Sequence, residues 1–259
     1  MQEYEAGIIR TECHGHNIYT IHLSCSEIAR EAKPGQFVQA RTCTGTAPFL
    51  RRTFSICGID SERGYVKLLI EVIGEGTEMI TTTRRGDCLN VIGPIGKSFT
   101  WRKNRHKSCV LVAGGVGVAP LVFLADTLRI SDHQPVTFLV GAQTAGIHAA
   151  FEGLFDSSIT VKQSTDDGSL GYHGLVTGLL DKYLESNKTD VIYTCGPRPM
   201  MKAVSVRAAN TGIECQVSME ENMACGIGAC YGCVVRLTDG RMLRSCVDGP
   251  VFDANEVDW

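Results

Sequence analysis

The sequence predicts three structural parts in order: an antiparallel β-barrel, a parallel α/β sheet and a small cysteine-rich C-terminal domain. Three observations carry this prediction. Short β-prone segments separated by Gly and Pro come first, a strand–glycine–helix alternation follows, and four cysteines gather near the end. A chain of 259 residues is too long for one small core. We expect the three parts to span 1–102, 103–213 and 214–259.

The first part shows the alternation of apolar and polar residues that is typical of strands. The β-prone segments are 19–24, 36–40, 53–56 and 66–73, of which the last is the clearest. Gly and Pro punctuate this part at Pro34-Gly35, Gly74 to Gly76, Gly93-Pro94 and Gly96. Short strands separated by regular turns predict a barrel.

The middle part begins with a continuous apolar run, 109–113, which ends in a glycine-rich loop and Pro120. This pattern predicts a buried parallel strand that opens into a helix, with the proline in the first helical turn. Further strands are expected at 136–141, 159–161 and 191–196, with helices over 178–185 and 200–209. Their alternation predicts a parallel sheet.

Bulk properties exclude several functions. A net charge of -3 gives no reason to expect nucleic acid or an acidic membrane as partner. The uncharged stretch 109–125 is shorter than the roughly 20 residues that a bilayer requires, and glycines interrupt it, so we expect no membrane span. The polar, acidic start, Met1 to Gly7, does not resemble a signal peptide, which predicts a cytoplasmic protein with reduced thiols.

The twelve cysteines fall into two groups. Four are clustered, which in a reducing compartment indicates metal ligands. For most of the other eight we expect small buried apolar side chains. These eight are Cys13, Cys25, Cys43, Cys57, Cys88, Cys109, Cys195 and Cys215.

The clustered cysteines have the spacing Cys225-x4-Cys230-x2-Cys233, with Cys246 further on. This is the plant-type [2Fe–2S] spacing. Intervening glycines let the backbone fold tightly and leave N–H groups free to point at cluster sulfurs. A hairpin over 234–244, with its turn at Thr238-Asp239-Gly240, would return Cys246 to the other three. The alternative is a zinc module, but zinc sites usually pair one C-x2-C with another or with histidines.

The glycine loop of the middle part contains Gly114, Gly115, Val116 and Gly117. Backbone N–H groups between a strand and a helix suit a pyrophosphate. The loop departs from G-x-G-x-x-G, and by itself it is equally compatible with a tight turn. The segment Cys195-Gly196-Pro197 ends the fourth strand and should lie on the same rim of the sheet, although Cys195 is also compatible with a buried thiol.

The segment Arg52-Thr53-Phe54-Ser55 has the groups that a flavin dinucleotide needs. Arg52 can pair with a diphosphate, Ser55 can reach a ring nitrogen, and Phe54 can pack on an aromatic ring. By themselves these residues fit an ordinary strand better. Gly76 and Thr77 lie in a second glycine turn that could approach a phosphate or be a plain turn before a helix.

Together these motifs resemble the ferredoxin–NADP reductase superfamily. The cysteine segment from Met219 and the sequence Cys246-Val-Asp-Gly-Pro-Val-Phe-Asp resemble, more narrowly, the electron-transfer subunits of class B dihydroorotate dehydrogenases. The resemblance spans essentially the whole chain. One departure is that many members carry Pro where this chain has Thr53.

The resemblance implies the cofactors and their sites. FAD would bind Arg52, Thr53, Phe54 and Ser55, with further contacts from Leu69, Ile70, Glu71, Gly76 and Thr77. NAD would bind Gly114, Gly115, Val116, Gly117, Cys195, Gly196 and Pro197, and a [2Fe–2S] cluster would bind Cys225, Cys230, Cys233 and Cys246. NAD is favoured over NADP because 141–145 holds no Arg or Lys for a 2′-phosphate.

The resemblance also implies an enzyme subunit of pyrimidine biosynthesis. Electrons would pass from the FMN of a dihydroorotate dehydrogenase catalytic subunit, through the cluster and FAD, to NAD+, in a heterotetramer with two copies of each subunit. A flavin between a one-electron cluster and a two-electron nicotinamide fits this order. We expect no catalytic acid or base in this chain, since no Ser/His/Asp order or paired carboxylate stands out. The alternative is a related flavin/[2Fe–2S] subunit that serves another partner, of the transhydrogenase or sulfide dehydrogenase type.

Overall fold

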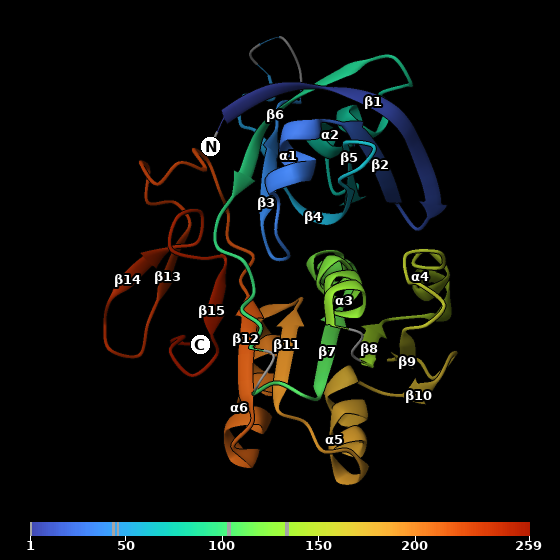
Figure 1. Cartoon of the computed structure of the whole chain (residues 1–259), viewed down its shortest axis with the longest axis vertical. Coiled ribbons are helices and arrows are strands. Elements are labelled where there is room, and N and C mark those ends of the chain that lie inside the picture. Colours follow the sequence, from blue (N-terminus) through green and yellow to red (C-terminus); the bar gives the residue numbers. More distant parts are fainter. Residues whose placement is uncertain (1, 43–44, 46, 103–104, 133–134) are drawn as a thin grey trace.

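The computed structural model describes residues 2–42, 45, 47–102, 105–132 and 135–259. A barrel, an α/β sheet and a smaller C-terminal segment make up the molecule (Figure 1). The smaller segment lies beside both of the others. This is the fold class that the sequence predicts.

The barrel closes in the order β1-β2-β5-β4-β3-β6, and each neighbouring pair is antiparallel. Its strands are β1 (Gln2–Gly15), β2 (Ile18–Ser24), β3 (Phe37–Ala40), β4 (Arg52–Asp60), β5 (Tyr65–Glu71) and β6 (Cys88–Ile95). Two short helices, α1 (Ser26–Glu31) and α2 (Glu75–Thr81), lie between strands. Alternate side chains such as Val38, Phe54 and Leu68 fill the interior.

One prediction for the barrel is wrong. Gly93-Pro94, expected at a turn, lies inside β6. The pairing of β6 with β3 shifts there, from Phe37↔Ile95 to Gln39↔Ile92, so Gly93 and Pro94 oppose Val38 in a bulge. A bulge tolerates the missing N–H of proline, and Val38 occupies the space where a β-carbon of residue 93 would stand.

The second sheet has the order β10-β9-β8-β7-β11-β12-β15. Its strands are β7 (Cys109–Gly114), β8 (Val136–Ala142), β9 (Thr160–Thr165), β10 (Tyr172–His173), β11 (Val191–Cys195), β12 (Glu214–Ser218) and β15 (Val251–Asp253). The strands from β10 to β12 are parallel, which confirms the predicted topology, and β15 adds an antiparallel edge.

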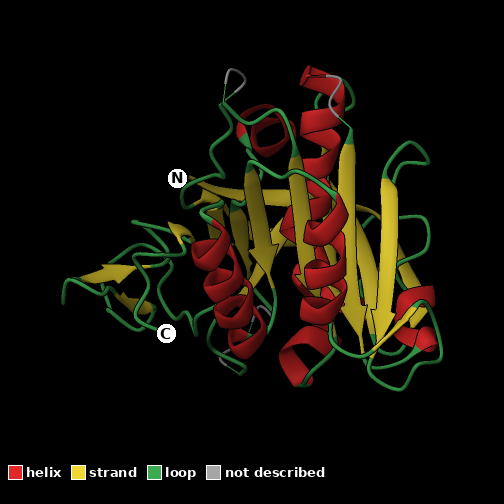
Figure 2. Ribbon diagram, turned by 90° about the horizontal axis from the view of Figure 1, so that it is seen from below, coloured by secondary structure: helices red, strands yellow, loops and turns green. Residues whose placement is uncertain are grey.

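Helices cover both faces of this sheet (Figure 2). They are α3 (Val118–Asp132), α4 (Ala145–Ala149), α5 (Val176–Ser186) and α6 (Arg198–Thr211), with a 3₁₀ turn over Gly115–Gly117. The apolar helix α3 lies between the sheet and the barrel, while α5 and α6 pack on the opposite face. Among the described helices, none combines the length and apolar character that a membrane crossing requires.

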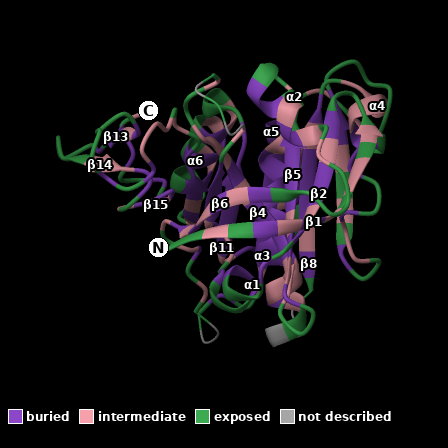
Figure 3. Ribbon diagram, turned by 90° about the horizontal axis from the view of Figure 1, so that it is seen from above, coloured by how far each residue is buried: buried purple, intermediate pink, exposed green. Residues whose placement is uncertain are grey.

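The C-terminal segment contains the predicted hairpin, β13 (Val234–Arg236) with β14 (Met242–Arg244). After the hairpin, β15 joins the edge of the large sheet, which fixes the segment to that sheet. Buried residues concentrate in the strands of the barrel and the sheet (Figure 3). A small apolar cluster joins Phe37 and Ile95 of the barrel to Cys233 and Cys246. The segment is therefore anchored on both other parts.

Candidate cofactor sites

The four clustered cysteines lie in two pairs. The Sγ atoms of Cys233 and Cys246 are 3.3 Å apart, because the hairpin between them returns the chain. In the other pair, the backbone N–H of Cys230 donates a hydrogen bond to Sγ of Cys225, with an N···S distance of 3.4 Å. Within the described residues, no three Cys, His, Asp or Glu side chains form a site for a single metal ion. Two pairs suit a [2Fe–2S] cluster, whose two irons share four thiolates, better than one zinc ion.

Backbone N–H groups in this loop favour the thiolate form of Cys225. Desolvation acts to raise the pKa of Cys225, but hydrogen bonds from the backbone of Ile227, Cys230 and Ala229 outweigh it and lower the pKa to about 6. The N–H of Gly232 also donates to Sγ of Cys230, with an N···S distance of 3.4 Å. A thiolate is the form that ligates iron, so the hydrogen bonds to Cys225 favour its ligating form.

The two pairs differ in burial. Cys233 and Cys246 are 3% and 1% exposed and pack on the barrel, whereas Cys225 is half-buried and Cys230 is exposed. Burial, followed by the neighbouring Cys233 thiol, raises the pKa of Cys246 to about 11. Cys233 and Cys246 would therefore hold a cluster from the barrel side, and Cys225 and Cys230 from the surface side.

The predicted diphosphate residues lie together. The guanidinium group of Arg52 packs on Gly76, and a β-carbon at residue 76 would lie 2.6 Å from Nε of Arg52. The Arg52 side chain is held by a 2.6 Å hydrogen bond to the carbonyl oxygen of Leu50. The hydroxyl of Thr77 accepts hydrogen bonds from the N–H groups of Ile73 and Gly74 and thereby shapes the turn. A cation and a glycine backbone thus converge as a phosphate would require.

The other predicted flavin residues divide between the surface and the interior. Thr53 and Ser55 lie on the outer face of β4, opposite Gln39 and Phe37 of β3. Phe54 lies in the barrel core and is 7% exposed, so its ring packs on the protein.

Strand β5 carries the remaining predicted flavin residues. Leu69 and Ile70 are buried, and Glu71 is exposed at the end of the strand. The outer face of β4 and the end of β5 are therefore the parts of the barrel that can meet a flavin.

The two predicted nucleotide segments are also adjacent. Ala113 and Cys195 are parallel partners in β7 and β11, so the following loops leave the sheet side by side. A β-carbon at Gly117 would collide with the carbonyl group of Cys195, and one at Gly196 would lie 2.9 Å from backbone atoms of Gly114. These close backbone approaches require glycine, and they form one rim at the carboxyl end of the sheet.

The side chain of Cys195 is buried. Its Sγ donates a hydrogen bond to Oε1 of Glu220, with an S···O distance of 3.6 Å. Burial, and then the Glu220 carboxylate, raise the pKa of Cys195 well above its ordinary value, so the group is a neutral thiol. The alternative of a buried thiol fits the side chain, whereas the backbone of Cys195 meets the glycine loop.

Two further residues of this region, Gln39 and Glu220, were missed by the sequence reasoning. Glu220 precedes the first cluster cysteine by five positions, and Gln39 lies in a short strand. Gln39 contacts Thr53, and Glu220 contacts Cys195, and each pair is distant in the sequence. No local pattern could have indicated either of them.

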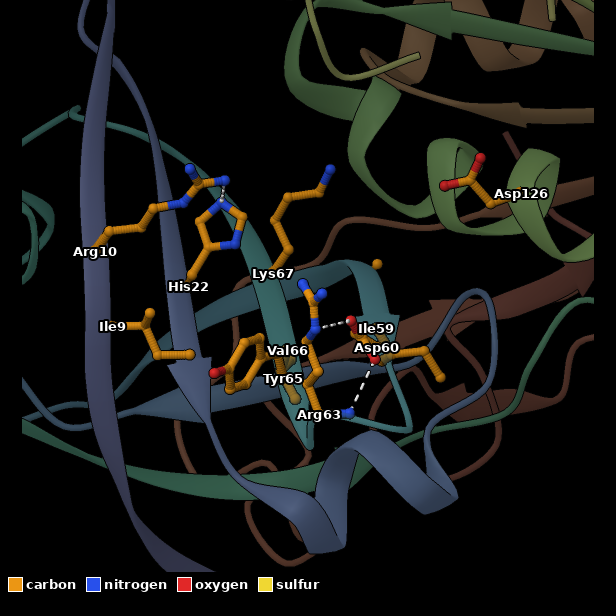
Figure 4. A pocket seen from close by; sticks show the side chains of 11 residues that line it. Ile9, Arg10, His22, Ile59, Asp60, Arg63, Tyr65, Val66, Lys67 and Asp126 are labelled. Carbon is orange, nitrogen blue, oxygen red and sulfur yellow. Dashed lines mark hydrogen bonds and ion pairs between the residues drawn. The ribbon is translucent and has the colours of Figure 1, made fainter. Parts of the chain in front are cut away.

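A separate cavity of about 480 Å³ lies on the outer face of the barrel near α3 (Figure 4). Its lining residues are Ile9, Arg10, His22, Gly58, Ile59, Asp60, Arg63, Tyr65, Val66, Lys67 and Asp126. None of these is a predicted cofactor residue. Burial, and then Arg10 and Lys67, lower the pKa of His22 to about 4, so its imidazole is neutral near pH 7.

Comparisons with known protein families identify all three parts. Residues 8–100 match an oxidoreductase FAD-binding domain, residues 111–206 match an oxidoreductase NAD-binding domain, and residues 220–258 match the iron–sulfur cluster binding domain of dihydroorotate dehydrogenase B. Fold and site therefore define an electron-transport oxidoreductase that uses FAD, NAD and a [2Fe–2S] cluster.

Full-length relatives specify the family. The chain is 37% identical to the dihydroorotate dehydrogenase B (NAD(+)), electron transfer subunit, of Desulforamulus reducens, and the match covers 99% of this chain and 98% of the relative. It is 34% identical to the subunit of the same name from Bacillus cereus (strain B4264), with 99% of both chains covered. The chain belongs to the family of dihydroorotate dehydrogenase B (NAD(+)) electron transfer subunits.

Solved structures agree on the fold. A structure of the NADH-dependent reduced ferredoxin-NADP oxidoreductase, studied for flavin-based electron bifurcation, superposes with a TM-score of 0.89 at 28% identity, covering 99% of this chain and 90% of the other. The ferredoxin reductase of carbazole 1,9a-dioxygenase superposes with a TM-score of 0.70 at 21% identity, covering 82% of this chain and 66% of the other. The latter similarity concerns the fold only.

Proposed function

We propose that this chain reduces NAD+ with electrons taken from the FMN of a dihydroorotate dehydrogenase catalytic subunit. The electrons pass through the [2Fe–2S] cluster and then FAD. The observation that carries this proposal is the unequal burial of the four cysteines. The Cys233–Cys246 pair packs on the flavin-binding barrel, and the Cys225–Cys230 side reaches the surface, where a partner can approach.

The residues of this chain would hold cofactors rather than perform acid–base chemistry. FAD, when bound, supplies the conversion between one-electron and two-electron transfer. Arg52 with Gly76 would hold its diphosphate, and the loops of Gly117 and Cys195 would hold the nicotinamide dinucleotide. The cluster delivers electrons only, so the proton that accompanies them in hydride transfer can come from solvent, and we propose no catalytic acid or base in this chain.

Several finer features belong to the same proposal. We assign 1–102 to FAD, 103–213 to NAD and 214–259 to the cluster, although β12 and β15 of the last segment pair in the nucleotide sheet. We propose two copies of each subunit per complex and a cytoplasmic location, where reducing conditions keep the thiols of the clustered cysteines free for iron.

A second candidate function is an NAD(P)H oxidoreductase subunit with another partner. The similarity to the NADH-dependent reduced ferredoxin-NADP oxidoreductase, over 99% of this chain, favours it. The two candidates share the cofactors and differ in the partner. Co-purification of the native complex with cofactor analysis separates them, because only a dihydroorotate dehydrogenase complex adds an FMN subunit and oxidises dihydroorotate.

Activity measurements test the electron path. The isolated subunit should oxidise NADH with an artificial dye and should not oxidise dihydroorotate. Cys230→Ser should spare NADH-to-dye transfer and abolish NAD+ reduction by dihydroorotate in the assembled complex, provided that the variant folds and binds its partner. Wild-type dihydroorotate:NAD+ turnover in an assembled, cluster-free complex would overturn the path. Dihydroorotate oxidation by this subunit without its partner would overturn the relay itself.

A further inference from the structure

Gln39 lies at the boundary between the FAD segment and the cluster loop. It is in β3 and is completely buried, with 0% of its surface exposed. On one side, its Nε2 lies 3.4 Å from the hydroxyl oxygen of Thr53, its cross-strand partner in the flavin segment. On the other side, its carboxamide packs against the Cα of Gly226, the residue after the ligand Cys225. A side chain at Gly226 would collide with this carboxamide.

The carboxamide has an unsatisfied atom. Among the described residues, Oε1 of Gln39 is buried and has no hydrogen-bond donor. An amide oxygen that is buried without a hydrogen-bond donor is energetically unfavourable, so the folded protein should satisfy it. The backbone around Gln39 is well anchored, since Nη1 of Arg51 donates to its carbonyl oxygen over 3.3 Å.

Rotation of the Gln39 carboxamide by 180° about its terminal bond gives Oε1 a hydrogen-bond donor. The Thr53 hydroxyl then donates to Oε1, and the NH2 group faces Gly226 and the cluster loop. The sulfurs of a [2Fe–2S] cluster with four thiolate ligands carry negative charge, and N–H donors to them are a main determinant of the cluster potential. A buried amide donor beside this loop meets that requirement.

We propose that Gln39 is a positioning residue that joins the two cofactor segments. Its NH2 group donates a hydrogen bond to a sulfur of the bound cluster, and Thr53 orients it from the flavin side. This inference rests on the proposed function, because it needs the cluster and FAD in place. It also gives a role to Thr53, since a proline at that position would have no hydroxyl to orient the amide.

The test is a redox titration of the purified subunit, followed by visible absorption and electron paramagnetic resonance. Gln39→Met keeps the length of the side chain and removes the donor. It should shift the reduction equilibrium of the cluster toward the oxidised form about tenfold, which is about 59 mV for one electron. Thr53→Val should shift it in the same direction by less, and the double variant should not exceed Gln39→Met. The potential of FAD should stay unchanged in Gln39→Met.

Gln36→Met is the matched control. Gln36 precedes β3, and its amide donates to the carbonyl oxygen of Gly96 rather than facing the cluster loop. This variant should keep the wild-type potential. An unchanged cluster potential and unchanged resonance signal in cluster-loaded Gln39→Met would overturn the proposal, as would a shift confined to FAD. Wild-type protein that binds no cluster would instead refute the proposed function. If Gln39→Met fails to load a cluster, Thr53→Val provides the test instead. An unchanged cluster potential in Thr53→Val would then overturn the role of Gln39.

Discussion

The guanidinium group of Arg52 occupies the space that a side chain at Gly76 would need. Nε, Cζ and Nη2 of Arg52 all lie within 2.8 Å of the position of a β-carbon at residue 76. Since Arg52 belongs to β4 and Gly76 to α2, this contact joins two separate segments that the sequence assigned to FAD. A substitution of either Arg52 or Gly76 therefore tests the flavin site.

Arg52→Ala should weaken the retention of FAD. A charge-assisted hydrogen bond to a phosphate contributes of order 1.5–3 kcal/mol, which corresponds to roughly one to two powers of ten in affinity. Flavin absorbance after extensive dialysis measures the effect. Arg63→Ala, an exposed change on the same barrel, is the control and should keep its flavin. Full occupancy in Arg52→Ala would exclude Arg52 from the diphosphate site.

Gly76→Ala should mimic the loss of Arg52 without removing a charge. The added methyl group would displace the guanidinium group, so we expect FAD affinity to fall by roughly tenfold, about 1.4 kcal/mol. Gly74→Ala is the matched control, because a β-carbon there would meet no atom of the described residues within 4 Å. Equal flavin content in the two variants would contradict the role of the Arg52–Gly76 contact.

Serine at any of the four clustered positions should remove most of the [2Fe–2S] signal. The variants are Cys225→Ser, Cys230→Ser, Cys233→Ser and Cys246→Ser, measured by electron paramagnetic resonance of the reduced protein. Cys88→Ser, on the exposed end of β6, should retain the cluster, and so should Cys43→Ser, whose position lies outside the described residues. A wild-type signal in one of the four would remove that residue from the ligand set.

Gly117→Ala should weaken the binding of NADH. Its methyl group would collide with the carbonyl group of Cys195, so the glycine loop must move away from the rim of the sheet. We expect the KM for NADH with an artificial dye to rise by roughly tenfold, about 1.4 kcal/mol. The flavin and cluster absorbance of the same sample is the internal control and should be unchanged. A wild-type KM would show that the loop is not part of the nucleotide site.

His22 should make the folded state less stable in mild acid. Its pKa is lowered to about 4, mainly by burial, from an ordinary value of about 6.5. Between these values the unfolded chain binds a proton that the folded chain does not, so stability falls as pH falls through this window. The urea midpoint should fall less between pH 7 and pH 5 in His22→Gln than in the wild type. The difference between the two proteins should be the same at pH 8 as at pH 7. Parallel curves down to pH 5 would refute the lowered pKa.

Local patterns predicted much of the fold and the composition of the candidate site. The strand 109–113 and the hairpin around Asp239 were found because apolar runs and turn residues are local signals. Strands β1 and β6 were not predicted from these patterns. In β6, Gly93-Pro94 suggested a turn, and the bulge became visible only from the register with β3.

The sequence by itself determined the ligand spacing of Cys225, Cys230 and Cys233 and the glycine loop at Gly114, because a cluster and a pyrophosphate need particular residues at short intervals. Only the tertiary structure decided which distant segments meet. It placed Cys233 and Cys246 on Phe37 and Ile95, and Gln39 between Thr53 and Gly226. Strand register and the packing of the barrel against the C-terminal segment produce these contacts. Both depend on the whole core, which no short stretch of sequence encodes.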